Sequence, residues 1–363
     1  MIEKYYDGAI EQVAAGLGTV EKNHLLVRYS GQFSVENLND TKQLEKNEDI
    51  FVQVHEFETG EITCAYEPYL TMICDGFRRY MTGTFEEFME TCDVYYLHRP
   101  VLLGYFNQDN TGREEIILLD EVAYEQERML AALERMLCAI ADRHPVLFVL
   151  NRFQLASKST MQLTARFLKC ENCNIGLVLG VSDIQAMPEF LVPDWEMLYE
   201  TLDDGSKIYH IGNSGRKKEE TIDDEKYVDY GSEKVYRKLQ NMVEFLDFDQ
   251  AAYYLETIER KIKFDNLLVD DAARFRMWLL FVKVSILRQD IPKALEICED
   301  LEKIHLAGKE EECAYEQDYL IATAYMYQGK LKEALEMAGE TYRIAGKIDR
   351  KSTRLNSSHV AIS

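Results

Sequence analysis

Residues 145–168 constrain the fold of this chain more than any other part of the sequence. Five apolar residues, 146–150, follow one another there without polar alternation. Such a run is typical of a parallel strand covered on both faces, because a strand with one face in water alternates apolar and polar side chains. An amphipathic segment then runs to Leu168, and Ser157 or Ser159 can cap it as a helix. We therefore expect a central buried strand followed directly by a helix.

The segments around this strand alternate in the same way. Short apolar runs predict four more strands, at residues 25–27, 50–55, 175–180 and 207–211. Apolar residues at helical spacing predict a helix after Pro68 and further helices over residues 2–16, 40–46, 84–106 and 120–143. Strands that alternate with helices indicate an α/β fold, a doubly wound sheet with a parallel core, and we assign it to residues 1–212.

The pattern changes in the last third of the chain. Residues 213–233 are polar and charged, which predicts a linker. Three later segments each place a small alanine at the start of a helix, after an apolar helix and a short polar turn. These alanines, Ala251, Ala294 and Ala334, are 43 and 40 residues apart. We therefore expect an all-α helical repeat domain over residues 234–347.

Charge and composition exclude several classes of partner. The formal net charge is −23, and binding to a nucleic-acid backbone needs a Lys/Arg surface, so we expect no nucleic-acid partner. The N-terminus lacks the apolar core of a signal peptide, and no run approaches the roughly 20 apolar residues of a membrane span. We expect a cytoplasmic protein.

The eight cysteines show no spacing typical of a small disulfide-rich domain, and we expect buried thiols. Cys170 and Cys173 form the one close pair, in a Cys-x-x-Cys arrangement. A zinc site needs a second pair or histidines at ligand spacing, and a thioredoxin-type site begins a helix, whereas this pair follows one. We therefore expect neither a metal site nor a redox site here.

The turn after the predicted strand at 25–27 lies where a phosphate-binding loop would lie, between a strand and a helix. Such a loop carries several glycines and a lysine that contacts the phosphates. This turn instead has a single glycine and no lysine at the helix start, and its candidate nucleotide-site residues are Ser30, Gly31, Gln32 and Ser34. We expect it to bind no nucleotide.

The central strand ends in Asn151 and Arg152. In P-loop ATPases the corresponding strand ends in acidic residues, which hold Mg²⁺ and polarise the attacking water. An amide and a guanidinium do neither, so we interpret both residues as part of a vestigial nucleotide site. Asp183, after the next strand, is the candidate acid of an atypical site, although it can also cap a helix. Lys158 lacks preceding glycines, and we expect it to be solvated.

Three segments carry a resemblance to a known family: FVQVHEFETGEITCAYEPYL (residues 51–70), PVLFVLNRFQLASKSTMQLTARFL (145–168) and NIGLVLGVSD (174–183). They resemble the P-loop ATPase domain of STAND-type signalling proteins, related to AAA-type ATPases, here in degenerate form. The later helices resemble tetratricopeptide repeats. The combination is similar to the N-terminal half of clostridial GGDEF-containing, tetratricopeptide-linked diguanylate cyclases. This resemblance implies a bacterial signalling protein, but the chain contains no GGDEF sequence.

We expect no enzymatic activity from this chain. Our first hypothesis is a non-hydrolysing regulatory or scaffold module, with an ATPase-like sensor domain and helical repeats that bind a protein or peptide. The alternative is a divergent ATP-binding NTPase switch; ATP and Mg²⁺ are otherwise not expected as cofactors. The candidate partner contacts are aromatic residues of the repeats, a residue type common in interfaces but also in repeat cores: Tyr253, Tyr254, Tyr315, Tyr319, Tyr325 and Tyr327.

The last residues, 348–363, do not continue the preceding pattern. Residues 349–359 can be back-translated, codon for codon, into a sequence that resembles a common short-read sequencing adapter. We therefore expect residues 348–363 to be a non-native, adapter-derived tail, and the natural repeat domain to be truncated near Lys347 with its output domain missing.

Overall fold

The computed structural model describes residues 2–18, 24–29, 49–58, 60–108, 121–170, 174–182, 187–203, 207–211, 229–304 and 311–352. The chain divides into two compact units. The first comprises Met1–Val228 together with Glu244–Gln250, and the second comprises Asp229–Val243 together with Ala251–Ser363. A short turn that lies among the C-terminal helices in sequence thus groups with the first unit.

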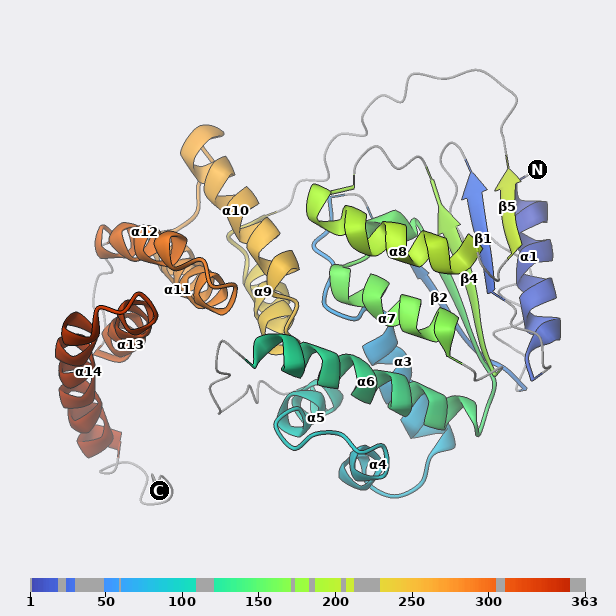
Figure 1. Ribbon diagram of the computed structural model, residues 1–363, viewed down its shortest axis with the longest axis horizontal. Helices are drawn as coiled ribbons and strands as arrows, with labels where there is room; N and C mark the ends of the chain where they lie inside the picture. Colours follow the sequence, from blue (N-terminus) through green and yellow to red (C-terminus); the bar gives the residue numbers. More distant parts are fainter. Residues whose placement is uncertain are drawn as a thin grey trace. The chain divides into compact units, whose positions relative to one another are not determined.

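Five parallel strands form the sheet of the first unit (Figure 1). They are β1 (His24–Tyr29), β2 (Phe51–Glu56), β3 (Val146–Asn151), β4 (Ile175–Val181) and β5 (Lys207–Ile211), and their order across the sheet is β2-β3-β4-β1-β5. The prediction of an α/β fold with a parallel core is confirmed. The order makes β1 and β3 second neighbours, because β4 pairs with both of them.

Helices cover both faces of this sheet. The described helices of this unit are α1 (Ile2–Gly16), α3 (Tyr69–Tyr80), α4 (Phe85–Thr91), α5 (Arg99–Asn107), α6 (Val122–Ala141), α7 (Lys158–Lys169) and α8 (Val192–Asp203), of which α4 and α5 contact each other. The region predicted to be helical over 84–106 contains two helices, α4 and α5. Helix α8 was not predicted, although Trp195, Leu198 and Leu202 are buried at helical spacing. The helix predicted over 40–46 lies outside the described residues.

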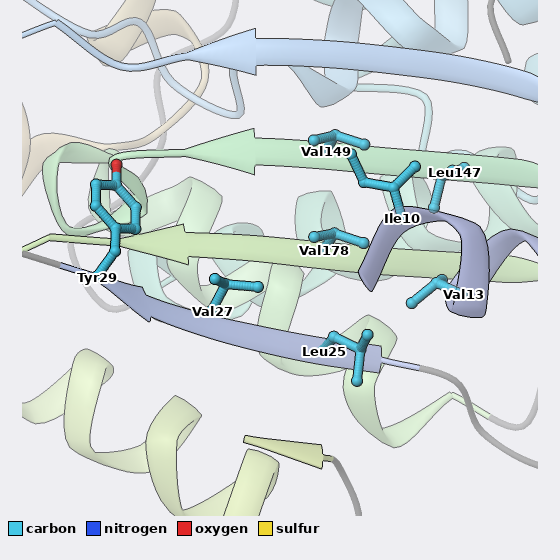
Figure 2. Close-up of a cluster of buried hydrophobic side chains, with 8 residues drawn as sticks. All are labelled: Ile10, Val13, Leu25, Val27, Tyr29, Leu147, Val149 and Val178. Carbon is cyan, nitrogen blue, oxygen red and sulfur yellow. The ribbon is translucent and has the colours of Figure 1, made fainter. Parts of the chain in front are cut away.

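Helix α1 packs against one face of the sheet (Figure 2). Its side chains Ile10 and Val13 are fully buried in a cluster with Leu25 and Val27 of β1, Leu147 and Val149 of β3, and Val178 of β4. A glycine in β4 allows this close approach, since a Cβ atom on Gly176 would lie 2.6 Å from Cγ1 of Val13. One face of the central strands is therefore sealed by the first helix of the chain.

The opposite face of β3 packs against α3 and α7. The ring of Phe148 lies 4.7 Å from that of Tyr69 on α3 and 6.4 Å from that of Phe167 on α7, measured between centroids. All six residues of β3 are buried. The prediction from the unbroken apolar run at 146–150 is therefore confirmed, because side chains on both faces of the strand are covered.

The described part of the second unit is helical, and its helices follow one another as three consecutive pairs. These are α9 (Glu233–Glu244) with α10 (Phe248–Phe264), α11 (Asp271–Leu287) with α12 (Ile291–Glu302), and α13 (Glu311–Tyr327) with α14 (Leu331–Ser352). The alanines that predicted the repeat are all buried: Ala251, Ala294 and Ala334. Close packing of each second helix therefore depends on a small side chain at its start.

The turn within each helix pair contains one residue with a left-handed backbone, and the residue type differs among the three turns. Leu246, Gln289 and Gly329 all have left-handed backbone conformations, with φ angles of 66°, 63° and 80°. Each lies five residues before its alanine. This conformation ends a helix and reverses the chain, so three different residues perform the same structural task.

Helix α14 extends to Ser352. Residues 349–352, which we interpreted as adapter-derived, are therefore helical. A helix propagates readily into a following segment that contains no glycine or proline, whatever the origin of that segment. Residues 353–363 lie outside the described residues, and the adapter origin of the tail stays a prediction.

Candidate functional site

The carboxyl ends of parallel strands are where open α/β sheets bind ligands, and in this chain they carry a set of linked polar side chains. The hydroxyl of Tyr29, at the end of β1, donates a hydrogen bond of 2.6 Å to Oδ1 of Asn151, at the end of β3. Figure 2 shows the ring of Tyr29 reaching from β1 past β4 toward the end of β3. Asn151 is fully buried, so its amide is a structural group.

The burial of Tyr29 raises the pKa of its hydroxyl to about 12, while the nearby Arg152 and the bond to Asn151 act in the opposite direction. The hydroxyl therefore stays protonated at neutral pH and remains the donor in this bond. Sequence reasoning missed Tyr29. The available signal was a polar group on the last residue of a buried strand, because the carboxyl ends of parallel strands, Asn151 among them, lie at the same end of the sheet.

Arg152 turns away from the strand directly after Asn151. Its backbone is left-handed, with a φ angle of 53°, and its Nε lies 3.5 Å from Oε1 of Glu56, the last residue of β2. The ion pair is largely shielded, since about a quarter of the Arg152 side chain and a sixth of the Glu56 side chain are accessible. The guanidinium is thereby held between the ends of two neighbouring strands.

A third link joins β3 to β4. Nε2 of Gln154 donates to Oγ of Ser182 at 2.5 Å, and the backbone N–H of Ser182 donates to Oε1 of Gln154 at 3.4 Å. The end of β3 is thus connected to β1, β2 and β4 through side chains. Such a network leaves the amide of Asn151 engaged as a hydrogen-bond acceptor inside the protein.

This geometry does not fit a Mg²⁺–nucleotide site at the end of β3. A magnesium ligand at this position needs a carboxylate that faces the ion or its water, whereas Asn151 is neutral, buried and already bonded to Tyr29. The other predicted nucleotide-site residues, Ser30, Gly31, Gln32, Ser34 and Asp183, lie outside the described residues. Within the described parts of the chain, no group of three or more His, Cys, Asp or Glu side chains could hold a metal ion.

A second polar cluster lies at the start of α7, where the sequence predicted a helix cap by Ser157 or Ser159 but none of the contacts to a distant turn. Ser157 caps the helix by accepting a hydrogen bond from the N–H of Thr160. The N–H of the neighbouring Ser159 donates at 3.0 Å to the carboxylate of Asp247, in the turn Glu244–Gln250. Asp247 is 4% exposed, and its burial raises the pKa of its carboxyl group.

The same turn engages Lys158. Its ammonium group lies 2.5 Å from Oδ2 of Asp249 and 4.0 Å from Oδ2 of Asp194, and its backbone N–H donates to the side chain of Gln250. The prediction that Lys158 is solvated is wrong, because this lysine is half-buried in an ion pair. The sequence signal was two acids, Asp247 and Asp249, that alternate with apolar residues directly after Phe245 and Leu246.

Apolar contacts complete the docking of this turn in the first unit. The ring of Phe245 lies 6.3 Å from that of Tyr66 and 5.8 Å from that of Tyr105, and Gln126 donates to the carbonyl of Leu246 at 2.7 Å. Phe245 and Leu246 are both buried. The turn Glu244–Gln250 is therefore an integral part of the first unit, although helices α9 and α10 flank it in sequence.

The candidate partner-binding tyrosines differ in exposure. Tyr253 and Tyr327 are each 36% exposed, while Tyr254, Tyr319 and Tyr325 are half-buried. The side chain of Tyr315 lies outside the described residues. Three apolar side chains of α14 are more exposed than these tyrosines: Leu331 is 67%, Leu335 is 74% and Tyr342 is 82% exposed. Sequence reasoning missed these α14 residues.

The cysteines are less uniformly buried than predicted. Cys74, Cys92 and Cys298 are buried, but Cys64, Cys138 and Cys170 are only half-buried.

No helix in the described parts of the chain is long and apolar enough to span a membrane. Comparison with protein-family models and with curated proteins finds no match to this chain.

Proposed function

We propose that this chain is a non-hydrolysing regulatory or scaffold module of a signalling protein. Its first unit acts as an ATPase-like sensor domain, and its helical repeats, similar to tetratricopeptide repeats, bind a protein or peptide. The hydrogen bond between Tyr29 and Asn151 carries the proposal. It places a structural bond where a P-loop ATPase needs a carboxylate for Mg²⁺.

The glycine-poor turn at residues 30–34 supports the same conclusion from the sequence. Two separate parts of a nucleotide site, the phosphate loop and the acidic strand end, depart from the working pattern together. A loss of both functions is expected when a domain keeps its sheet for structural reasons and no longer turns over nucleotide. The sheet then serves to hold the helices around it.

A titration of the full chain with labelled ATP and Mg²⁺ tests the sensor part. We expect no phosphate release from the wild type, and none from Asn151→Asp, because a buried carboxylate beside the Tyr29 hydroxyl does not reach solvent. Phosphate release that Asp183→Ala abolishes would instead establish the divergent NTPase switch. Nucleotide binding without release would identify a ligand-gated module.

The exposed apolar side chains support the second part of the proposal. Tyr327, Leu331 and Leu335 extend along the turn that joins α13 to α14 and the first part of α14. Exposed aromatic and aliphatic side chains grouped in this way are typical of protein interaction surfaces. Binding of a peptide or protein here would remove them from water.

A matched pair of variants tests the repeat surface. The variant Tyr327→Ser with Leu335→Ser removes two of these side chains, and the control variant Tyr124→Ser removes an exposed tyrosine of α6, 68% exposed. Each protein is cross-linked in cell extract, and the captured proteins are identified. A protein captured by the wild type and the control, but lost from the double variant, supports the proposal. Identical captures from all three proteins would contradict it.

A further inference from the structure

Two cysteine side chains meet where α6 packs against α7. Sγ of Cys138, near the end of α6, lies 3.6 Å from Sγ of Cys170, the residue that caps the end of α7. A disulfide bond needs a sulfur–sulfur distance of about 2.05 Å, so the two sulfur atoms are already in contact and have to approach further for a bond to form. Both residues are half-buried, whereas Cys74, Cys92 and Cys298 are buried.

The surrounding contacts hold these two residues opposite each other. One helical turn before each cysteine, Nε of Arg166 on α7 bonds at 2.7 Å to the carboxylate of Glu134 on α6. The guanidinium also pairs with Glu127 on α6. Equal steps along both helices, from Glu134 to Cys138 and from Arg166 to Cys170, keep the two helices in register. The sulfur atoms are therefore neighbours because of a fixed helix packing.

We propose that Cys138 and Cys170 form a reversible disulfide, which makes this helix contact a site of oxidative modification by hydroperoxides. One cysteine loses its proton and attacks, as the thiolate, an oxygen atom of hydrogen peroxide; this gives a sulfenic acid and hydroxide, which takes up the proton as water. The second thiol displaces the hydroxyl group of the sulfenic acid, which forms the S–S bond and releases a second molecule of water. Two thiols are oxidised, hydrogen peroxide is reduced to two waters, and a dithiol reverses the change.

The chemistry of the pair indicates a site that is modified slowly. The hydrogen bond to Cys170, burial, and the carboxylates of Glu134 and Asp142 all raise the pKa of the Cys138 thiol. Because the thiolate is the reacting form, little of Cys138 is reactive at neutral pH. The pair therefore differs from the activated cysteine of a peroxidase, and oxidant exposure has to be sustained to form the bond.

The bond would join residues 32 positions apart, and the closed loop would contain β3 with Asn151 and Arg152. A cross-link of this length restricts the unfolded chain. We expect oxidation to raise the thermal unfolding midpoint of the first unit by roughly 5–10 °C, and a dithiol to reverse the shift.

The test uses the full chain, reduced and then treated with hydrogen peroxide at mildly alkaline pH. Remaining thiols are alkylated, and the protein is digested with trypsin and with a protease that cleaves after glutamate. The second cleavage, at Glu171, separates Cys170 from Cys173. We expect a linked pair of peptides that contain Cys138 and Cys170, found in folded protein and not in protein oxidised in urea.

Variants distinguish this site from general oxidation. Cys138→Ser and Cys170→Ser are each expected to lose the linked peptides and the midpoint shift, whereas Cys74→Ser, at a buried thiol of α3, is expected to keep both. Circular dichroism verifies that each variant is folded. The peptide mapping of the wild type tests the proposal even if a variant does not fold. A folded wild type with no such link, a Cys170–Cys173 link in its place, or equal linkage in urea would overturn the proposal.

Discussion

The carboxylate of Asp247 tests whether the turn Glu244–Gln250 is held by a hydrogen bond or by charge. It accepts the backbone N–H of Ser159 at 3.0 Å in a site where Asp247 is 4% exposed. Asp247→Ala leaves this buried N–H without its acceptor, which costs roughly 1–3 kcal/mol. Asp247→Asn keeps an oxygen of the same reach and removes only the charge. The free energy of unfolding should therefore be lower for the alanine variant than for the asparagine variant by that amount.

The pH dependence has a definite sign. Burial raises the pKa of Asp247, so ionisation of this carboxyl group in the folded protein costs stability. The cost is absent below the ordinary aspartate value of 3.8 and grows as the pH rises through the interval up to the raised pKa. Relative to the wild type, Asp247→Asn should gain stability across this interval and keep the gain at pH 7.

Urea unfolding measures both effects. The chain has two tryptophans, and a Trp278→Phe background leaves Trp195 of α8 to report on the first unit. The midpoint for Asp247→Ala should be the lower of the two variants at pH 7. Equal loss in the alanine and asparagine variants would show that the charge holds the turn, and an unchanged alanine variant would refute the hydrogen bond itself.

Three further tests, with five substitutions in all, examine the packing. Tyr29→Phe should lower the free energy of unfolding by roughly 1–2 kcal/mol, measured by the same urea method, because a buried amide oxygen loses its donor. Gly176→Ala should lower the free energy of unfolding by roughly 1–3 kcal/mol, because the added methyl group overpacks the core. Gly8→Ala should be neutral or stabilising, because a Cβ atom there would have no neighbour within 4 Å. Equal thermal midpoints for the two variants would contradict this reasoning. Gln289→Gly should raise the thermal unfolding midpoint of the second unit, because a left-handed backbone costs a residue other than glycine roughly 1 kcal/mol. Gly329→Ala should lower the same midpoint for the same reason. The reverse order of the two midpoints would refute the shared turn.

Much of the fold could be predicted from local pattern. All five strands, most of the helices of the first unit and the three helix pairs follow from apolar spacing, since the period of buried side chains records which face of an element is covered. Helix α8 escaped prediction although its spacing was present. The three left-handed turns could not be found in the same way, because Leu246 and Gln289 do not share the residue type that normally marks such a turn.

The candidate site was accessible only in part. Asn151 and Arg152 were recognisable as a strand end without acids, but their partners were not. Tyr29 lies 122 residues from Asn151, and the two residues meet because β4 alone separates β1 from β3. The order of strands depends on how helices and crossovers pack together, and no short segment of sequence encodes it.

Local sequence patterns are enough to predict the alternation of strand and helix, the burial of the central strand on both faces and the recurrence of a small alanine in the helical repeats. These are properties of neighbouring residues along one element. Long-range packing, by contrast, brings Tyr29 to Asn151, Cys138 to Cys170, and the turn Glu244–Gln250 to the start of α7. Each of these contacts joins segments far apart in the chain, and its energy exists only once the packing has brought them together.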